Sequence, residues 1–152
     1  KTASGSLLFV SDKVFTQIQI NKLPLAVFLD TGDSDYATID SWFYEKHKEH
    51  IPIDTSINKE ILNQAFIHGV RQNIPYELVS NPHISVNDME ICTSKDNKVY
   101  IKSLMDLNSP NTNPSNNLYL NITDGVVGYN FFKHLGHKIM FDFRNMRLDI
   151  IE

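Results

Sequence analysis

An aspartate, a threonine and a glycine follow directly on a short apolar run. Residues Leu25 to Leu29 (LAVFL) lead into Asp30, Thr31 and Gly32. An ionised carboxylate at the end of a buried strand is costly unless other groups compensate its charge. Three common residues in a row are a weak signal alone, because Asp and Gly both favour turns. The triplet is therefore either a turn at a strand end or an acid held in place for chemistry.

Carboxylates can act as general acid and general base when they work as a pair. One group must take a proton from water while another gives a proton to the carbonyl oxygen. Two aspartates that share a proton can do both, because like charges at close range separate their titrations. The chain has one Asp-Thr-Gly triplet.

A second motif lies far downstream of the triplet. Val126, Val127 and Gly128 precede a run of helix formers from Tyr129 to Leu135, which Gly136 should end. The residues after this helix predict a closing hairpin that turns at the sequence RNM, residues 144–146.

Together these segments resemble the retropepsin-like aspartic proteases of the pepsin and retropepsin clan. The resemblance rests on the apolar run into Asp30-Thr31-Gly32, and on Val126-Val127-Gly128 with the short helix and hairpin behind it. It extends in outline from Val14 to Ile150. The most similar members are longer bacterial ones, found in Bacteroides-type organisms, with a similar FLDTG…FYEKH start. Many of them are exported, so the resemblance implies a periplasmic or cell-envelope location.

The resemblance implies a mainly β fold: a closed β-barrel half of the acid-protease type with one or two short helices, as a single domain over residues 1–152. Asp30 would be the catalytic carboxylate of an aspartic endopeptidase that acts on a polypeptide and needs no cofactor. Its partner acid would come from a second copy in a two-fold dimer or from an upstream half of a longer polypeptide. Thr31 would form hydrogen bonds across the symmetry axis, and Gly32 would let the backbone approach the acids. Gly69 would lie at the tip of a flap that closes over substrate, although an ordinary turn glycine is an equal alternative.

Asp33 departs from the family pattern, in which a small residue usually follows the triplet. We count it with the substrate-binding residues, since it would add a carboxylate close to the acid pair. A further negative charge should hinder ionisation of Asp30. This leaves open a catalytically silent module that binds peptide or protein on the same fold. Asn130, by contrast, fits the family pattern, which commonly has an acid or asparagine there.

Other reactive side chains give weaker signals. The pairs His47/His50 and His134/His137 have a spacing that could place two imidazoles on one helix face. The first pair lies in a strongly charged run, and the second straddles Gly136, so we expect no metal. Ser34 lacks the glycine-flanked pattern of a hydrolase nucleophile. The single cysteine, Cys92, cannot form an internal disulfide.

The composition narrows the class of protein. The 152 residues are 41% hydrophobic and 21% charged, with a net charge of −4, as in ordinary globular domains. No basic stripe with interleaved aromatics appears, so nucleic acid is not an expected partner. No apolar run approaches the roughly 20 residues that a membrane-spanning helix needs. The abrupt start of the sequence suggests that an export signal or an N-terminal half precedes it.

The elements that must position these residues can be read from sequence patterns. The residues from Val14 to Ile20 predict a strand, with Val14, Thr16, Ile18 and Ile20 on one face and Phe15, Gln17 and Gln19 on the other. This strand turns at NKLP into the strand Leu25 to Leu29. That second strand does not alternate, so we expect it to be buried on both faces.

The middle of the chain predicts one helix among short strands. The sequence YATI, residues 36–39, predicts a strand, and a helix capped by Asp40 or Ser41 should end at Ile51, before Pro52. Residues 61–91 predict several antiparallel strands. Residues 106–117, rich in Asn, Ser and Pro, predict a loop, and the sequence LYLNI behind it predicts another strand.

Overall fold

The computed structural model describes residues 3–10, 12–56, 62–67, 70–87, 89–91, 98–102, 123–135 and 138–151. Several sequence predictions fall outside these ranges. They concern the flap glycine Gly69, the lone cysteine Cys92, the helix-ending Gly136 and the histidine His137. The predicted loop, residues 106–117, and the predicted strand after it, residues 118–122, also lie outside.

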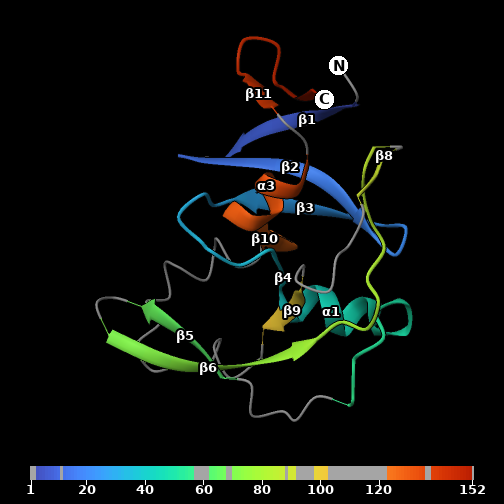
Figure 1. Cartoon of the computed structure of the whole chain (residues 1–152), viewed down its shortest axis with the longest axis vertical. Helices are drawn as coiled ribbons and strands as arrows, with labels where there is room; N and C mark the ends of the chain where they lie inside the picture. The colour runs from blue at the N-terminus through green and yellow to red at the C-terminus, as the bar shows by residue number, and fades with distance from the viewer. Residues whose placement is uncertain are drawn as a thin grey trace.

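The described chain is mainly β, with two short α-helices, as the sequence predicts (Figure 1). The strands are β1 Ala3–Val10, β2 Lys13–Ile20, β3 Leu23–Leu29, β4 Ala37–Ile39, β5 Leu62–Ile67, β6 Val70–Leu78, β7 Ile84–Val86, β8 Met89–Ile91, β9 Val99–Lys102, β10 Gly125–Val127, β11 Lys138–Asp142 and β12 Arg147–Ile151. The helices are α1 Ser41–His47, followed by the 3-10 turn η1 Lys48–His50, and α3 Tyr129–Leu135.

The closed β-barrel half is a wrong prediction. Within the described residues, the strand order β11-β12-β1-β2-β3-β10-β4-β9-β6-β5 forms an open path. Figure 1 shows its two ends, β11 at the top and β5 at the bottom, on opposite sides of the molecule. Between them, β7 adds to β2, and β8 adds to β7. The pattern of alternating strands was sufficient to predict sheet, but it carries no information about whether the sheet closes.

The β2–β3 hairpin delivers the chain to Asp30. Asn21 and Lys22 at its turn both have positive φ, 51° and 68°, as a two-residue hairpin turn with the twist of the flanking strands requires. β3 is not buried on both faces, which corrects the sequence prediction. Leu25 and Val27 are buried, but Ala26 between them is exposed. Its small apolar side chain made the run look continuous although the strand alternates.

A short parallel strand lies at the centre of the sheet. β10 pairs in parallel with β3, from Gly125 opposite Val27 to Val127 opposite Leu29. On its other side β10 pairs with β4 in antiparallel, with Val127 opposite Ala37. β4 in turn pairs in parallel with β9. The chain on either side of Asp30, residues 25–39, therefore flanks β10 on both sides.

The two helices follow the sequence predictions closely. α3 spans the predicted residues and buries Phe131, Phe132 and Leu135. The first predicted helix reaches its expected limit before Ile51, but its last turn, η1, is a 3-10 turn. Asp40 precedes α1 without a side-chain capping hydrogen bond. None of the helices in the described part of the chain is long and apolar enough to cross a membrane.

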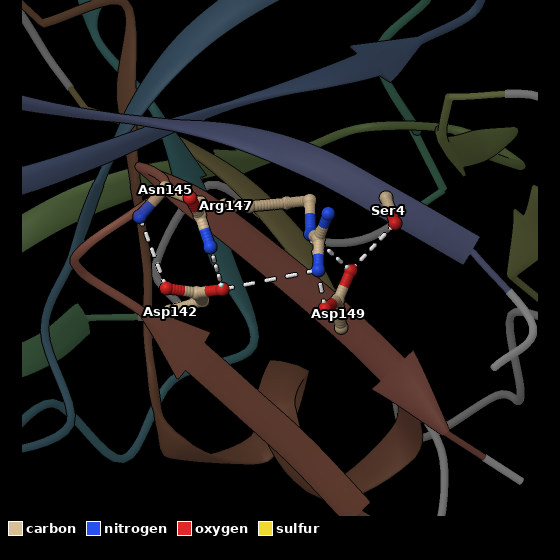
Figure 2. Close-up of polar contacts among 5 residues, drawn as sticks. All are labelled: Ser4, Asp142, Asn145, Arg147 and Asp149. Carbon is tan, nitrogen blue, oxygen red and sulfur yellow. Dashed lines mark hydrogen bonds and ion pairs between the residues drawn. The ribbon is translucent and has the colours of Figure 1, made fainter.

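The two ends of the described chain are joined through β1. Its first half, Ala3 to Ser6, pairs with β12, and its second half, Leu7 to Val10, pairs with β2. Polar side chains reinforce the first pairing (Figure 2). The buried Asp149 of β12 accepts a hydrogen bond of 2.6 Å from Ser4 Oγ and forms an ion pair of 2.9 Å with Arg147 Nε.

Candidate active site

The candidate acid lies at the end of β3 and is fixed to β10. The main-chain N–H of Asp30 donates to the carbonyl oxygen of Val127 at 3.0 Å, which continues the parallel pairing one residue beyond the strand. The side chain of Asp30 is half-buried. Its position therefore depends on the central strand of the sheet rather than on a free loop.

The three residues of the triplet form a tight turn. Gly32 N–H donates to Asp30 Oδ1 at 3.0 Å, and Asp33 N–H donates to the Asp30 carbonyl oxygen at 3.2 Å. A Cβ on residue 32 would lie 3.3 Å from Asp30 Oδ1, closer than most such contacts. Glycine thus leaves room for its own N–H to reach the carboxylate. Thr31 and Gly32 at the tip are exposed, so a second loop can approach them.

Asp33 has a structural contact inside the loop. Its Oδ1 accepts a hydrogen bond of 2.9 Å from the N–H of Asp35, a turn that aspartate side chains commonly form. Its carbonyl oxygen accepts a 2.7 Å bond from Tyr129 N–H. Asp33 is thus a residue of the same loop as Asp30, and its predicted role in substrate binding stays a prediction, as do the catalytic roles of Asp30, Thr31 and Gly32.

The second sequence motif packs directly against the Asp30 loop, which we define as residues 30–36. Gly128 N–H donates to the carbonyl oxygen of Tyr36 at 3.1 Å. A Cβ on residue 128 would overlap the carbonyl oxygen of Asp35 and lie 2.6 Å from that of Asp33. Glycine at this position is what allows the two segments to touch. The two motifs that carried the family resemblance are therefore in contact.

Asn130 adds a side-chain contact that the sequence did not predict. Its Nδ2 donates to the carbonyl oxygen of Ser34 at 2.6 Å. The sequence marked Asn130 only as fitting the family pattern. Its partner is a main-chain atom 96 residues away, and no pattern in a single sequence points to such a pairing.

The environment of the loop combines apolar packing with buried hydroxyls. Tyr36 is buried against Phe131 of α3, with ring centroids 5.3 Å apart, and burial raises the pKa of its phenol well above the ordinary value. On the other side, Phe28, two residues before Asp30, packs on Phe15. These contacts hold the strand end and the loop between the sheet and α3.

The histidine candidates have other contacts. His134 Nδ1 lies 2.6 Å from the carbonyl oxygen of Asn130, within α3. The ring of His47 packs on that of Phe43 at 4.5 Å. Among the described residues no three His, Cys, Asp or Glu side chains are arranged to hold a metal ion.

The flap prediction has an indirect structural context. β5 and β6 pair in antiparallel register from Leu62 opposite Pro75 to Ile67 opposite Val70. Gly69 itself lies between the ends of these strands and outside the described residues. Its role in a flap stays a prediction.

Comparison with known proteins gives a likeness only at the level of solved structures. The chain is similar to a retropepsin-like aspartic protease from Rickettsia conorii, with 10% identity, a TM-score of 0.49, and coverage of 99% of this chain and 95% of that one. It is also similar to the retroviral protease-like domain of Ddi1 from Leishmania major, with 12% identity, a TM-score of 0.46, and coverage of 95% of both chains. No family model and no curated protein matches. The nearer resemblance to Bacteroides-type members has no support from these comparisons.

Proposed function

We propose that the chain is an aspartic endopeptidase domain whose active unit pairs two Asp30 loops. The observation that carries the proposal is the placement of Asp30. Its main chain is fixed to β10, its carboxylate is oriented by Gly32 N–H, and the loop tip beside it is exposed. The same residues, with Val126-Val127-Gly128 in contact behind them, give the sequence its resemblance to retropepsin-like proteases.

The chemistry needs one ionised and one protonated carboxylate. The ionised aspartate takes a proton from water as the water oxygen attacks the peptide carbonyl carbon, and the protonated one gives its proton to the carbonyl oxygen. The C–N bond of the tetrahedral intermediate then breaks as the nitrogen takes a proton from one aspartate, while a hydroxyl of the intermediate gives its proton to the other and forms the carbonyl of the product acid. A single Asp30 cannot hold both states at once, so we propose that a second copy of the chain supplies its mate. An upstream half of a longer polypeptide would serve the same purpose.

A substitution of the acid itself tests the proposal. Asp30→Asn keeps an acceptor for Gly32 N–H but cannot ionise, so cleavage of a randomised peptide library between pH 3 and pH 7 should be abolished while the circular dichroism spectrum is retained. Asp54→Asn is the matched control, because Asp54 also accepts hydrogen bonds within a turn, from Ser56, at a site remote in sequence. Retained cleavage by Asp30→Asn would exclude Asp30 as the catalytic acid.

A second candidate function is a catalytically silent module that binds peptide or protein. Asp33 favours it, because a carboxylate stands in the same loop as Asp30 where the family pattern usually has a small residue. This candidate predicts no turnover of the library by the wild-type protein. It also predicts no binding of a hydroxyethylene mimic of the transition state. Tight binding of the mimic, measured by calorimetry, would exclude the silent module.

A further inference from the structure

Four successive residues, Val127 to Asn130, form hydrogen bonds with the Asp30 loop, both at its first residue and in its second half, residues 33–36. Val127 accepts the N–H of Asp30, and Gly128 and Tyr129 donate their N–H groups to the carbonyl oxygens of Tyr36 and Asp33. The fourth contact is the bond from Asn130 Nδ2 to the carbonyl oxygen of Ser34, at 2.6 Å. The first three are main-chain contacts, which use no side-chain donor or acceptor. The fourth depends on the identity of residue 130.

We infer that Asn130 is a positioning residue for the acid at position 30. This inference rests on the proposed function for its catalytic consequence, but not for its structural content. The amide of Asn130 fixes the Ser34 carbonyl, and Ser34 adjoins Asp33, whose N–H is bonded to the Asp30 carbonyl. Asn130 therefore limits how far the second half of the loop, residues 33–36, can move relative to Asp30. Proton sharing depends on the distance between two acids, so a small displacement of the loop should lower turnover.

The structure also shows that Asn130 is not a core residue whose loss would unfold the chain. It is exposed, and its side-chain contact with the loop is at the surface. Burial on α3 is supplied instead by Phe131, Phe132 and Leu135. A change at residue 130 should therefore alter the loop while leaving the packing of the helix intact.

Two substitutions separate positioning from general stability. Asn130→Ala removes the donor at every pH. Asn130→Asp keeps the shape, and its carboxyl can donate to the Ser34 carbonyl only while protonated, so the contact should survive at pH 3 and fail as pH rises past about 4. The titratable groups nearest in sequence or by contact are Asp33 and Asp35 in the loop and Tyr129, Lys133 and His134 on α3. Asn145→Ala is the control, since Asn145 Nδ2 bonds Asp142 in a distant turn.

The experiment measures loop order and turnover on the full chain. NMR order parameters of the Gly32, Asp33 and Asp35 amides should fall from about 0.85 towards 0.6 in Asn130→Ala and remain unchanged in Asn145→Ala. Peptide turnover should fall about fivefold in kcat with KM unchanged, the size expected for one lost hydrogen bond. Asn130→Asp should match the wild type at pH 3 and Asn130→Ala at pH 6.

The two readouts distinguish failure of this inference from failure of the proposed function. A wild-type protein that cleaves no peptide, but whose loop loses order in Asn130→Ala, would leave the positioning role intact and remove the enzyme. Unchanged loop order parameters in Asn130→Ala would overturn the positioning role, whatever the turnover. Identical behaviour of Asn130→Asp and Asn130→Ala at every pH would overturn it as well.

Discussion

Gly128 lies so close to Asp33 that a Cβ at residue 128 would be 2.6 Å from the Asp33 carbonyl oxygen and would overlap that of Asp35. The first prediction follows from this contact. Gly128→Ala must push the Asp30 loop away from β10, because both clashing atoms are main-chain atoms. We expect a loss of about 3 kcal/mol in the free energy of unfolding, as in overpacked cores, measured by urea denaturation.

Gly5→Ala is the matched control for that substitution. A Cβ on Gly5 would meet Thr16 Oγ1 at 3.4 Å and Val86 at 3.6 Å, ordinary contacts with side chains. Alanine also loses less conformational freedom than glycine on folding, so the change should be neutral or stabilising by about 0.5 kcal/mol. An equal loss in the two variants would show that the contact between Gly128 and the loop is not special.

The second prediction concerns the hydroxyl of Tyr36. It is buried, and no hydrogen bond to it is found among the residues that the structure describes. A buried hydroxyl without a partner costs about 1–3 kcal/mol, so Tyr36→Phe should raise the free energy of unfolding by about 1 kcal/mol. The exposed Tyr129 provides the comparison, because Tyr129→Phe should change the free energy by no more than about 0.5 kcal/mol. A destabilised Tyr36→Phe variant would instead indicate that the hydroxyl has a partner in solution.

The third prediction concerns the ion pair between Arg147 and Asp149 of β12. Arg147→Met would remove the cation that lies 2.9 Å from the carboxylate of Asp149, a residue that is 1% exposed. Asp149 is buried but the Arg147 side chain is 40% exposed, so solvent screens part of the attraction and we expect a loss of about 1–2 kcal/mol. Arg144→Met in the adjacent turn should cost less than about 0.5 kcal/mol, since this residue is exposed. Thermal unfolding of both variants would show whether the effect belongs to the pair or to charge alone.

The fourth prediction uses pH. Burial raises the pKa of Asp124 above its ordinary value, and this outweighs the hydrogen bond from Ala26 N–H and the nearby charges of His47 and Lys46. A raised pKa in the folded state means that Asp124 contributes stability fully below the unfolded pKa of about 3.9 and loses it as pH rises through the folded pKa. Between pH 3 and pH 7, the difference in stability between Asp124→Asn and the wild type should shift in favour of the variant.

Asp142 should show the opposite sign. Hydrogen bonds from the Asn145 side chain and main chain lower the pKa of Asp142. Its contribution is therefore present above the unfolded pKa and disappears as pH falls through the folded one. Over the same pH interval, the stability difference should shift against Asp142→Asn. Denaturant titrations of Asp124→Asn and Asp142→Asn at several pH values would test both predictions. Shifts of the same sign in the two variants would contradict them.

Local patterns predicted the elements of this fold better than their connections. The helix Tyr129–Leu135 follows from a run of aromatic and helix-forming residues, and the β2–β3 turn follows from Asn21, which tolerates positive φ. The same local view failed at Ala26, which is apolar but exposed. The closed barrel that the family resemblance implied is also wrong, because the described strands form an open path. Whether a sheet closes depends on pairings between distant strands, and the sequence of one strand does not reveal which strand it pairs with.

The candidate site shows the same division. The sequence drew attention to Asp30 and to Val126-Val127-Gly128, and the structure brings these segments into contact. The sequence could not show that residues 127–130 form hydrogen bonds with the Asp30 loop, because the partners there are main-chain atoms of Asp33, Ser34 and Tyr36. Every residue has a main-chain carbonyl group, so the residue type does not indicate which carbonyl accepts a hydrogen bond. The three-dimensional structure is needed to identify it.

The divided pairing of β1 makes the beginning of the chain a structural support for its end. Among the described residues, β12 pairs with β11 and, through Ala3 to Ser6, with the remainder of the sheet. Leu7 N–H adds a hydrogen bond to the carbonyl oxygen of Met146, just before β12. A protease that clipped the polypeptide before Leu7 would remove this ladder together with Ser4, and so release the last two strands. Nicking near one terminus would then be detected as fraying at the other.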